Sequence, residues 1–355
     1  MKVYKRRFLF RCDGTRDTGL GHVSRCIALA EALQECGAFC VFSGKFSSGA
    51  HHLLNSPGII FEDLECETGS REDLDSLLGN YRLYNTDAII VDSYFIDNSF
   101  LDYLVQYGVQ IILIDDFNKL DYYQYHAVLN FTVNAIRLPY PCQEILCLLG
   151  PEYFLARRSL RRLRAEHKKH SSQVDNILVV MGGVDADNTT ERIVRLLSEI
   201  ASRLTVRVVV GSCYQAKETL YQQVTRCNHD CNVIDQLPDL TEQFAWCDVC
   251  ICAGGLTKYE AAYLGIPAAV LSQNKEQAEE TRHFARRGLA FDLGLHSTTT
   301  TAELASRLNV FLNDSVLRKN ISEAGQACFP LDPTLQAAEM LCHLPRDYED
   351  DELSE

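Results

Sequence analysis

The sequence contains no apolar run approaching the ~20 residues that a membrane-spanning helix needs. It is also poor in positive charge, because 34 Lys and Arg residues stand against 48 Asp and Glu, a net charge of −14. We therefore expect no stable membrane insertion and no nucleic-acid partner. The basic N-terminal stretch lacks the long apolar segment and small-residue cleavage site of a signal peptide, so a cytoplasmic protein is expected.

Metal-binding patterns are weak despite 15 cysteines. Most of these lie inside apolar runs, where a free thiol behaves as a small hydrophobic side chain. The clusters at 227–231 and 247–252 have close spacing, but no second Cys-x-x-Cys pair follows at the distance of a zinc finger. We expect structural thiols, no metal site and no bound cofactor.

What the sequence does contain is enough apolar material for two cores, with 46% hydrophobic residues among 355. Short β-rich apolar runs alternate with helical patterns, which indicates an α/β protein with parallel sheets. Strands are predicted at 7–12, 38–43, 88–92, 109–114, 128–130, 176–181, 205–210, 232–234, 249–252 and 268–271. Helices are predicted at 23–36, 74–84, 99–107, 189–202, 237–246, 257–264, 276–287 and 301–312.

The pattern divides into two doubly wound, Rossmann-like domains, at 1–156 and 174–345. Between them lies a basic stretch, 157–173, in which Arg157, Arg161, Arg164 and Lys168 fall at helical spacing. It is interpreted as a solvated linker helix, with a phosphate- or membrane-facing patch as the alternative. The acidic tail 346–355 has few apolar residues and is predicted to be disordered.

The first candidate site follows the first predicted strand. Gly19 and Gly21 allow the backbone to pass close to a ligand, and the helix that starts near residue 23 offers unpaired N–H groups to an anion. The dinucleotide fingerprint fails here, because its third glycine is missing. His22 is either a proton acceptor or a packing histidine, and Asp13 either orients it, binds a sugar hydroxyl or caps the turn.

The second candidate site comprises two glycine turns in the C-terminal half. Gly182 and Gly183 follow one strand, and Gly254 and Gly255 follow a buried strand that leads into a helix. Close approach of a diphosphate to these turns would place it near the N–H groups and hydroxyl of Thr257. Glu260 could accept hydrogen bonds from ribose hydroxyls. Turn glycines, a helix cap and a solvated glutamate are the alternative for each.

The order of motifs resembles a known family over residues 7–290. It runs FRxD, GxGHxxR, VDSY, IDD, LxGPEY, MGGxD, AGG with a later Glu, and a loop ending in Gln. This order resembles the UDP-sugar hydrolases of pseudaminic acid biosynthesis, which act on UDP-2,4-diacetamido-2,4,6-trideoxy-β-L-altropyranose. These enzymes are related to the glycosyltransferase-B superfamily.

The resemblance implies a glycosyltransferase-B fold, with two Rossmann-like domains facing across a cleft. It implies inverting, metal-independent hydrolysis of a UDP-linked acylamino sugar, with His22 as the catalytic residue and with Asp13 and Tyr94 at positions that line the sugar pocket. Asp13 is also predicted to act with His22 in catalysis. The sugar would lie at Gly19, Gly21, Arg25, Tyr94 and Glu276, and UDP at Gly182, Gly183, Gly254, Gly255, Thr257, Glu260 and Gln277. The substrate is the one partner that the sequence indicates.

Two departures from the family leave other functions open. Glu276 stands where the family commonly has asparagine before Gln277, and Lys258 lies within an altered glycine turn. The first alternative is a transferase that moves the sugar from UDP to a sugar or lipid acceptor. The others are a nucleotide-sugar binding protein with a decayed site and, last, a nicotinamide dehydrogenase.

Overall fold

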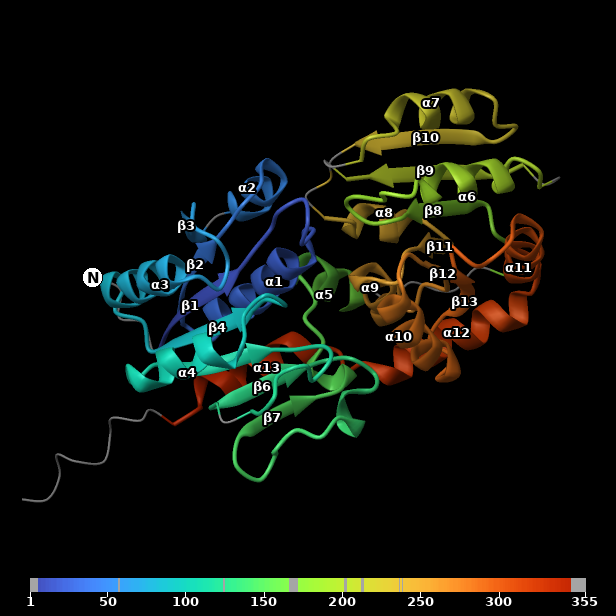
Figure 1. Cartoon of the computed structure of the whole chain (residues 1–355). Helices are drawn as coiled ribbons and strands as arrows, with labels where there is room; N and C mark the ends of the chain where they lie inside the picture. The colour runs from blue at the N-terminus through green and yellow to red at the C-terminus, as the bar shows by residue number, and fades with distance from the viewer. Residues whose placement is uncertain are drawn as a thin grey trace, which may run out of the picture. The chain divides into compact units, whose positions relative to one another are not determined.

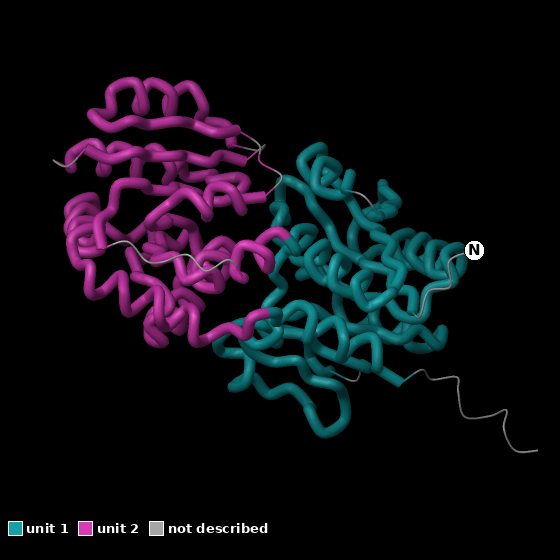
Figure 2. The backbone as a smooth tube through the Cα atoms, turned by 180° about the vertical axis from the view of Figure 1, so that it is seen from behind, with its two compact units in different colours: residues 1–158, 332–355 teal, residues 159–331 magenta. Residues whose placement is uncertain are grey.

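The computed structural model describes residues 6–56, 58–123, 125–165, 172–200, 203–211, 214–235, 237 and 239–345. Lys168 and the tail 346–355 lie outside these residues. The chain forms two compact units, one of Met1–Arg158 with Asp332–Glu355 and one of Ser159–Leu331 (Figure 2).

The first unit is built on a seven-stranded parallel sheet of order β3-β2-β1-β4-β5-β6-β7 (Figure 1). Its strands are β1 (Arg7–Cys12), β2 (Phe39–Gly44), β3 (Ile60–Asp63), β4 (Ala88–Asp92), β5 (Gln110–Ile114), β6 (Ala127–Asn130) and β7 (Leu146–Leu149). The central strands are buried on both faces, as expected for a parallel sheet with helices on each side.

Alternate residues of each central strand serve the two faces of this sheet. Leu9, Ile89 and Ile111 pack in one core with α3 (Arg71–Leu83) and α4 (Asn98–Gln106). Phe8 and Phe10 lie on the opposite face, where the Phe10 ring stacks on Phe42 with centroids 4.7 Å apart. The remaining helices of the unit are α1 (Gly21–Glu35), α2 (Ser48–Leu54) and α13 (Pro333–Cys342).

Helix α13 returns to the first unit after the chain has completed the second (Figures 1 and 2). It packs against α1. Arg6 fastens the end of this segment by donating to the carbonyls of Leu341 and Leu344, and Gln110 donates to the carbonyl of Pro345 at 2.7 Å.

The second unit has a six-stranded parallel sheet of order β10-β9-β8-β11-β12-β13 (Figure 1). Its strands are β8 (Asn176–Val180), β9 (Thr205–Val210), β10 (Asp230–Asp235), β11 (Val249–Cys252), β12 (Ala268–Ser272) and β13 (Phe291–Leu295). Its helices are α6 (Thr189–Leu197), α7 (Lys217–Thr225), α8 (Thr241–Trp246), α9 (Leu256–Leu264), α10 (Lys275–Arg286), α11 (Thr301–Asn313) and α12 (Ser315–Cys328). One core joins α6, α7 and α11 to a face of the sheet, and α8, α9 and α10 contact its strands elsewhere.

Each sheet has one point at which the order of its strands reverses direction. The chain builds outward from β1 to β3 on one side and from β4 to β7 on the other, so the reversal lies between β1 and β4. In the second unit it lies between β8 and β11. Open α/β sheets bind ligands outside the carboxyl ends of their strands at this reversal, and both candidate sites predicted from the sequence follow these strands.

The central strands and most helices agree with the prediction to within a few residues. The prediction missed β3, β7 and β13, three strands at sheet edges, and the helices α2, α7, α12 and α13. The observed boundary falls at Arg158, and residues 332–345 belong with the first unit rather than the second.

The basic stretch does contain a helix, α5 (Arg158–Ala165), but its arginines are not simply solvated. Arg157 pairs with Glu31 at 3.2 Å and Arg158 with Glu35 at 2.5 Å. Arg164 is buried, donates to the carbonyl of Gln326 at 2.8 Å and lies over the Tyr263 ring. These arginines therefore make structural contacts with other helices of the chain. Among the described helices, none is both long and apolar enough to cross a membrane.

Candidate active site

His22 lies at the reversal point of the first sheet, in the first turn of α1. Its Nδ1 is 2.6 Å from Oδ1 of Asp92, the last residue of β4. A carboxylate only accepts hydrogen bonds, so Nδ1 carries the proton and the neutral ring keeps a lone pair on Nε2. No hydrogen bond joins Nε2 to any described residue. An imidazole held in this tautomer is suited to take a proton from a substrate.

Arg25 is one turn further along α1 and bridges two carboxylates. Its Nε and Nη2 donate to the two oxygens of Asp92 at 2.7 and 2.6 Å, and its Nη1 donates to Asp116 at 2.8 Å. Nη2 also lies 3.3 Å from His22 Nδ1. Because the buried guanidinium is engaged by these side chains, the predicted role of Arg25 in sugar binding does not fit its geometry.

Tyr94 completes this group from the loop after β4. Its hydroxyl donates to Asp116, and its ring packs edge-on against His22 with centroids 4.6 Å apart. Half of the residue is exposed (50%). We call His22, Arg25, Asp92, Tyr94 and Asp116 the His22 cluster.

Electrostatics fix the ionisation of the cluster's buried groups. Burial by itself raises the pKa of Asp92, but Arg25 and His22 outweigh burial and hold that pKa well below its usual range. Burial lowers the pKa of Arg25, but Asp116 and Asp92 together raise it well above its usual value. Desolvation and Asp116 raise the pKa of the Tyr94 hydroxyl, which stays protonated and donates.

The sequence analysis proposed Asp13 as a partner of His22, but the structure gives that place to Asp92. The Asp13 carboxylate accepts hydrogen bonds from Arg11 Nη1 (2.7 Å), the N–H of Lys45 (2.8 Å) and the Thr68 hydroxyl (2.9 Å). Arg11 also makes a two-pronged pair with the fully buried Asp73, at 2.9 and 2.8 Å. This Arg11 network ties together the loops after β1, β2 and β3.

The sequence analysis did not name Asp92 or Asp116, although both lie in its motifs, Asp92 in VDSY and Asp116 in IDD. Asp92 ends β4 and Asp116 follows the neighbouring parallel strand β5, so both side chains lie at the carboxyl edge of the sheet. Asp115 faces other partners, the hydroxyls of Tyr123 at 2.5 Å and Tyr140 at 2.7 Å.

The start of α1 leaves room for a ligand next to His22. Gly19 has φ +71°, a left-handed conformation that favours glycine, whereas Gly21 has no such requirement. A Cβ atom at either position would meet nothing within 4 Å. The N-cap residue, Leu20, provides no side-chain cap, so the first N–H groups of α1 remain available to an anion.

The first glycine turn of the second unit is less open to an anion than predicted. Gly182 has φ +87° and Gly183 has open space beyond its Cα. However, the buried Asp185 accepts from the N–H groups of Thr189 (2.9 Å) and Thr190 (2.8 Å). The chain's own carboxylate therefore occupies the start of α6.

The second glycine turn offers the free helix terminus. Gly255 is the N-cap of α9 and provides no side-chain cap, and a Cβ there would meet nothing within 4 Å. Thr257 lies half-buried in the first turn, and Glu260 is half-buried one turn later. Gly254 is needed for packing, because a Cβ there would come within 2.8 Å of Gln277 Cβ.

Two glutamines join the loops at this edge of the second sheet. Gln273 donates to the carbonyl of Met181 at 2.6 Å and, through its N–H, to Gln277 Oε1 at 3.0 Å. Gln277 packs against Gly254, so the predicted glycine turns and Gln277 are brought together. Gln273 was missed by the sequence analysis, although it lies within the predicted loop. Glu276 is exposed in the first turn of α10.

Lys258, which lies within the altered glycine turn, faces inward. It is buried, donates to the carbonyl of Gly254 and pairs with Glu280. Glu280 therefore neutralises the charge of Lys258 within the unit, and the hydrogen bond from Lys258 to Gly254 stabilises the glycine turn.

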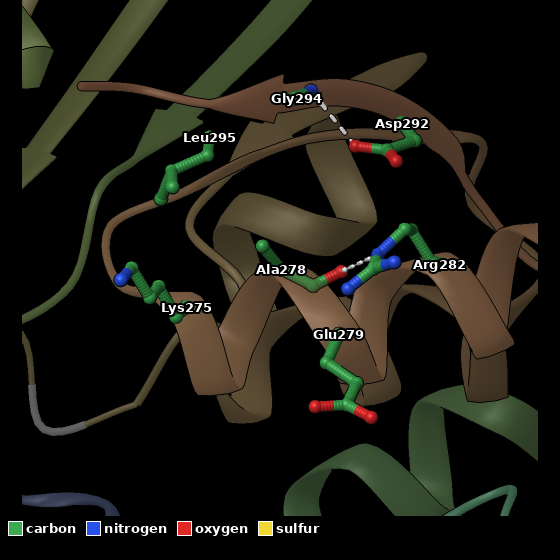
Figure 3. A pocket seen from close by; sticks show the side chains of 7 residues that line it. All are labelled: Lys275, Ala278, Glu279, Arg282, Asp292, Gly294 and Leu295. Atoms are coloured by element: carbon green, nitrogen blue, oxygen red, sulfur yellow. Dashed lines mark hydrogen bonds between the residues drawn. The ribbon is translucent and has the colours of Figure 1, made fainter. Parts of the chain in front are cut away.

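A pocket of about 480 Å³ lies beside α10 and the edge strand β13 (Figure 3). It is lined by Lys275, Ala278, Glu279, Arg282, Asp292, Gly294 and Leu295. Arg282 donates to the carbonyl of Ala278, and Gly294 N–H to Asp292 (Figure 3). None of the predicted site residues lines this pocket.

The described part of the chain contains no group of three His, Cys, Asp or Glu side chains placed to hold a metal ion. In the cluster at 227–231, His229 Nε2 lies 2.6 Å from the backbone carbonyl of Leu197, and the backbone N–H of Leu204 donates to His229 Nδ1 at 3.4 Å. Cys250 and Cys252 lie within the buried strand β11.

No profile of a known protein family matches the chain. It is 25% identical to an uncharacterized protein of Methanocaldococcus jannaschii over 276 residues, 75% of this chain and 56% of that protein, so it spans about half of that relative's length. It is 23% identical to spore coat polysaccharide biosynthesis protein SpsG of Bacillus subtilis, over 88% of this chain and 91% of that protein. A Shewanella denitrificans pyrophosphoryl-undecaprenol N-acetylglucosamine transferase is 23% identical over 57% and 60% of the two chains.

Solved structures establish the fold. Acinetobacter baumannii MurG superposes with a TM-score of 0.66 at 17% identity, over 94% of this chain and 99% of that chain. Spinosyn forosaminyltransferase SpnP gives 0.65 at 13% identity, over 95% and 99%. The chain has the glycosyltransferase-B fold, with two parallel-sheet Rossmann-like units, as the sequence analysis predicted.

Proposed function

We propose that the chain is a glycosyltransferase-B enzyme that transfers the sugar of a UDP-linked donor to an acceptor hydroxyl. The observation that carries this proposal is the His22–Asp92 pair at the reversal point of the first sheet, with Nε2 left open. Similarity to a named N-acetylglucosamine transferase and to a forosaminyltransferase structure supports the choice of transfer. Similarity to SpsG supports a place in polysaccharide biosynthesis.

In this mechanism His22 Nε2 accepts the proton of the acceptor hydroxyl. The acceptor oxygen forms a bond to the anomeric carbon, on the face opposite UDP. The bond from the anomeric carbon to the β-phosphate oxygen breaks, and UDP leaves with the electron pair. One direct displacement inverts the anomeric centre. A base of this kind contributes about 10²–10⁴-fold in rate, and Asp92 stabilises the imidazolium that forms.

UDP binding is assigned to the second unit. The uncapped start of α9 at Gly255 presents N–H groups and a helix dipole to a diphosphate. Thr257 adds a hydroxyl, and Glu260 is placed one turn away to accept hydrogen bonds from ribose. Gly182 and Gly183 are assigned to the same ligand through backbone contact, because Asp185 already caps α6.

Hydrolysis is the second candidate, with water in place of the acceptor. The order of the motifs that contain His22, Asp92 and Asp116 favours it, since that order resembles the UDP-sugar hydrolases named above. The donor would then be a UDP-linked acylamino-deoxy sugar. The chemistry at His22 is the same in both reactions, so the acceptor decides between them.

The test is product formation by the full chain with and without an acceptor. UDP-N-acetylglucosamine and UDP-2,4-diacetamido-2,4,6-trideoxy-β-L-altropyranose are incubated separately and followed by ³¹P and ¹H NMR. UDP that appears only after a sugar or lipid-linked acceptor is added supports transfer, and UDP with free inverted sugar supports hydrolysis. UDP binding without release from any donor tested would contradict both and indicate a binding protein.

A matched pair of variants connects the reaction to the site. His22→Ala removes the base, so release of UDP should fall by about 10²–10⁴-fold while UDP binding by calorimetry is unchanged. His51→Ala is the control, because His51 pairs with Asp63 at 2.8 Å but on an exposed surface. Retained turnover in His22→Ala would remove His22 from the mechanism.

A further inference from the structure

The His22 cluster contains more charge than a histidine–aspartate pair requires. Asp92 and Asp116 contribute two negative charges and Arg25 one positive charge, so the cluster carries −1 with a neutral ring and 0 with a protonated ring. Arg25 joins the two carboxylates, with donor–acceptor distances of 2.6–2.8 Å to Asp92 and Asp116. All three are largely buried, so water screens these charges poorly.

We propose that Arg25 and Asp116 are positioning residues that set, through Asp92, the pH at which His22 takes up a second proton. This inference rests on the proposed function, in which the neutral ring is the base. Arg25 opposes protonation of His22 and keeps Asp92 ionised. Asp116 offsets part of the Arg25 charge and fixes the guanidinium in the plane that serves both carboxylates.

Other groups that face His22 act on the same equilibrium. The N-terminal end of α1 opposes protonation of a side chain in its first turn. The Tyr94 hydroxyl is held by Asp116, and burial of the neighbouring Cys26 raises the pKa of its thiol, so both remain neutral. Among the described residues, Asp92 is therefore the one anion in direct contact with the ring, and Arg25 is the one cation in direct contact with it.

The two residues predict shifts of opposite sign. Arg25→Gln leaves the cluster at −2 with a neutral ring, so the ring should take up a proton at a higher pH than in wild type. Asp116→Asn leaves it at 0, so the ring should take up a proton at a lower pH. Asparagine keeps the shape of Asp116 and one acceptor oxygen, but its NH₂ group cannot accept, so one contact from Arg25 or Tyr94 is lost together with the charge. A merely structural role would not produce opposite signs.

The experiment uses the full chain labelled with ¹³C in its histidine rings. The ring signal of His22 is assigned by its loss in His22→Ala, and its chemical shift is followed against pH in wild type, Arg25→Gln and Asp116→Asn. The double variant restores the charge of −1, so its midpoint should return toward wild type. Arg25→Lys, which keeps the charge, should lie closer to wild type than Arg25→Gln.

Midpoints that do not move, or that move in the same direction in both single variants, would overturn the inference. Circular dichroism and thermal melting verify that each variant is folded, and Asp116→Asn preserves the test if Arg25→Gln does not fold. The readout needs no substrate. If the midpoints shift in opposite directions but the chain cleaves no donor, the positioning role of Arg25 and Asp116 stands and the proposed function is rejected. In an active chain, the acidic limb of the pH profile of kcat/KM should move with the midpoint.

Discussion

The two reversal points of this molecule share one topology but differ in the side chains that they bring together. In the first unit, the start of α1, the end of β4 and the loop after β5 bring buried ionised side chains into contact around His22. In the second unit, the loops after β8, β11 and β12 and the start of α10 present glycine backbone and the neutral amides of Gln273 and Gln277.

The proposed function accounts for this difference. A general base needs one tautomer and one orientation, and the hydrogen bond from His22 Nδ1 to Asp92 fixes both. A diphosphate brings its own charge, so its site needs N–H groups and space rather than side-chain anions. Asp185 and Lys258 support this interpretation, because their charges are used internally, to cap α6 and to pair with Glu280.

The largest effect should come from Asp92→Asn. The variant loses the anion that holds the His22 tautomer, so kcat should fall by about 10²–10⁴-fold. UDP affinity, which we assign to the second unit, should not change. Asp63→Asn, in the exposed pair with His51, is the control. Steady-state kinetics measure kcat and titration calorimetry measures UDP affinity. Wild-type turnover in Asp92→Asn would show that Asp92 has no role in the reaction.

The next effect concerns stability. Asp73→Asn removes a fully buried partner of Arg11 and leaves part of that guanidinium uncompensated, which should cost about 3–5 kcal/mol in the free energy of unfolding. The matched control is Asp75→Asn, whose pair with Arg71 is exposed and is worth about 0–1 kcal/mol. Urea denaturation measures both, and equal costs would mean that the Arg11 network contributes no more than a surface pair.

The ionised state of Asp92 predicts how stability depends on pH. Because the folded pKa of Asp92 lies below its unfolded value, its contribution is present above the unfolded pKa and is lost as the pH falls through the folded pKa. Denaturation midpoints should therefore decline in the acid range. Asp92→Asn should decline less steeply than wild type, and parallel slopes would argue against this contribution.

Alanine substitutions at the adjacent glycines Gly254 and Gly255 should have different effects, the first on stability and the second on UDP binding. Gly254→Ala places a Cβ 2.8 Å from Gln277 Cβ and should cost about 1–3 kcal/mol of stability. Gly255→Ala meets no neighbour within 4 Å, so the fold should persist. Its methyl group would face the proposed diphosphate, and UDP affinity should fall. Thermal melting and calorimetry of both variants test this, and unchanged UDP affinity in Gly255→Ala would move the diphosphate away from α9.

The smallest effect is expected for Glu260→Gln. Loss of a charged acceptor for ribose hydroxyls should weaken UDP binding by about tenfold, or about 1.4 kcal/mol. Glu279→Gln, on the exposed part of α10, is the comparison variant. Identical calorimetric titrations for wild type and Glu260→Gln would exclude its proposed contact with ribose.

Burial explains which elements the sequence predicted well. The central strands β1, β4 and β8 are continuous apolar runs because helices cover both faces. The edge strand β3, Ile60–Asp63, is partly exposed and mixes polar with apolar residues, so its pattern resembles a loop. Helix α13 looks like an extension of the second unit along the chain, and only its packing on α1 assigns it to the first.

The sequence by itself determined the α/β class, the two-unit division and the position of His22 and the glycine turns at strand ends. These features depend on local periodicity and on the conformational freedom of glycine. Tertiary structure decided that Asp92, 70 residues from His22, orients the ring, that Arg25 bridges two carboxylates, and that α9 rather than α6 has a free terminus. Those outcomes depend on which strands lie side by side, and that order is set by long-range packing.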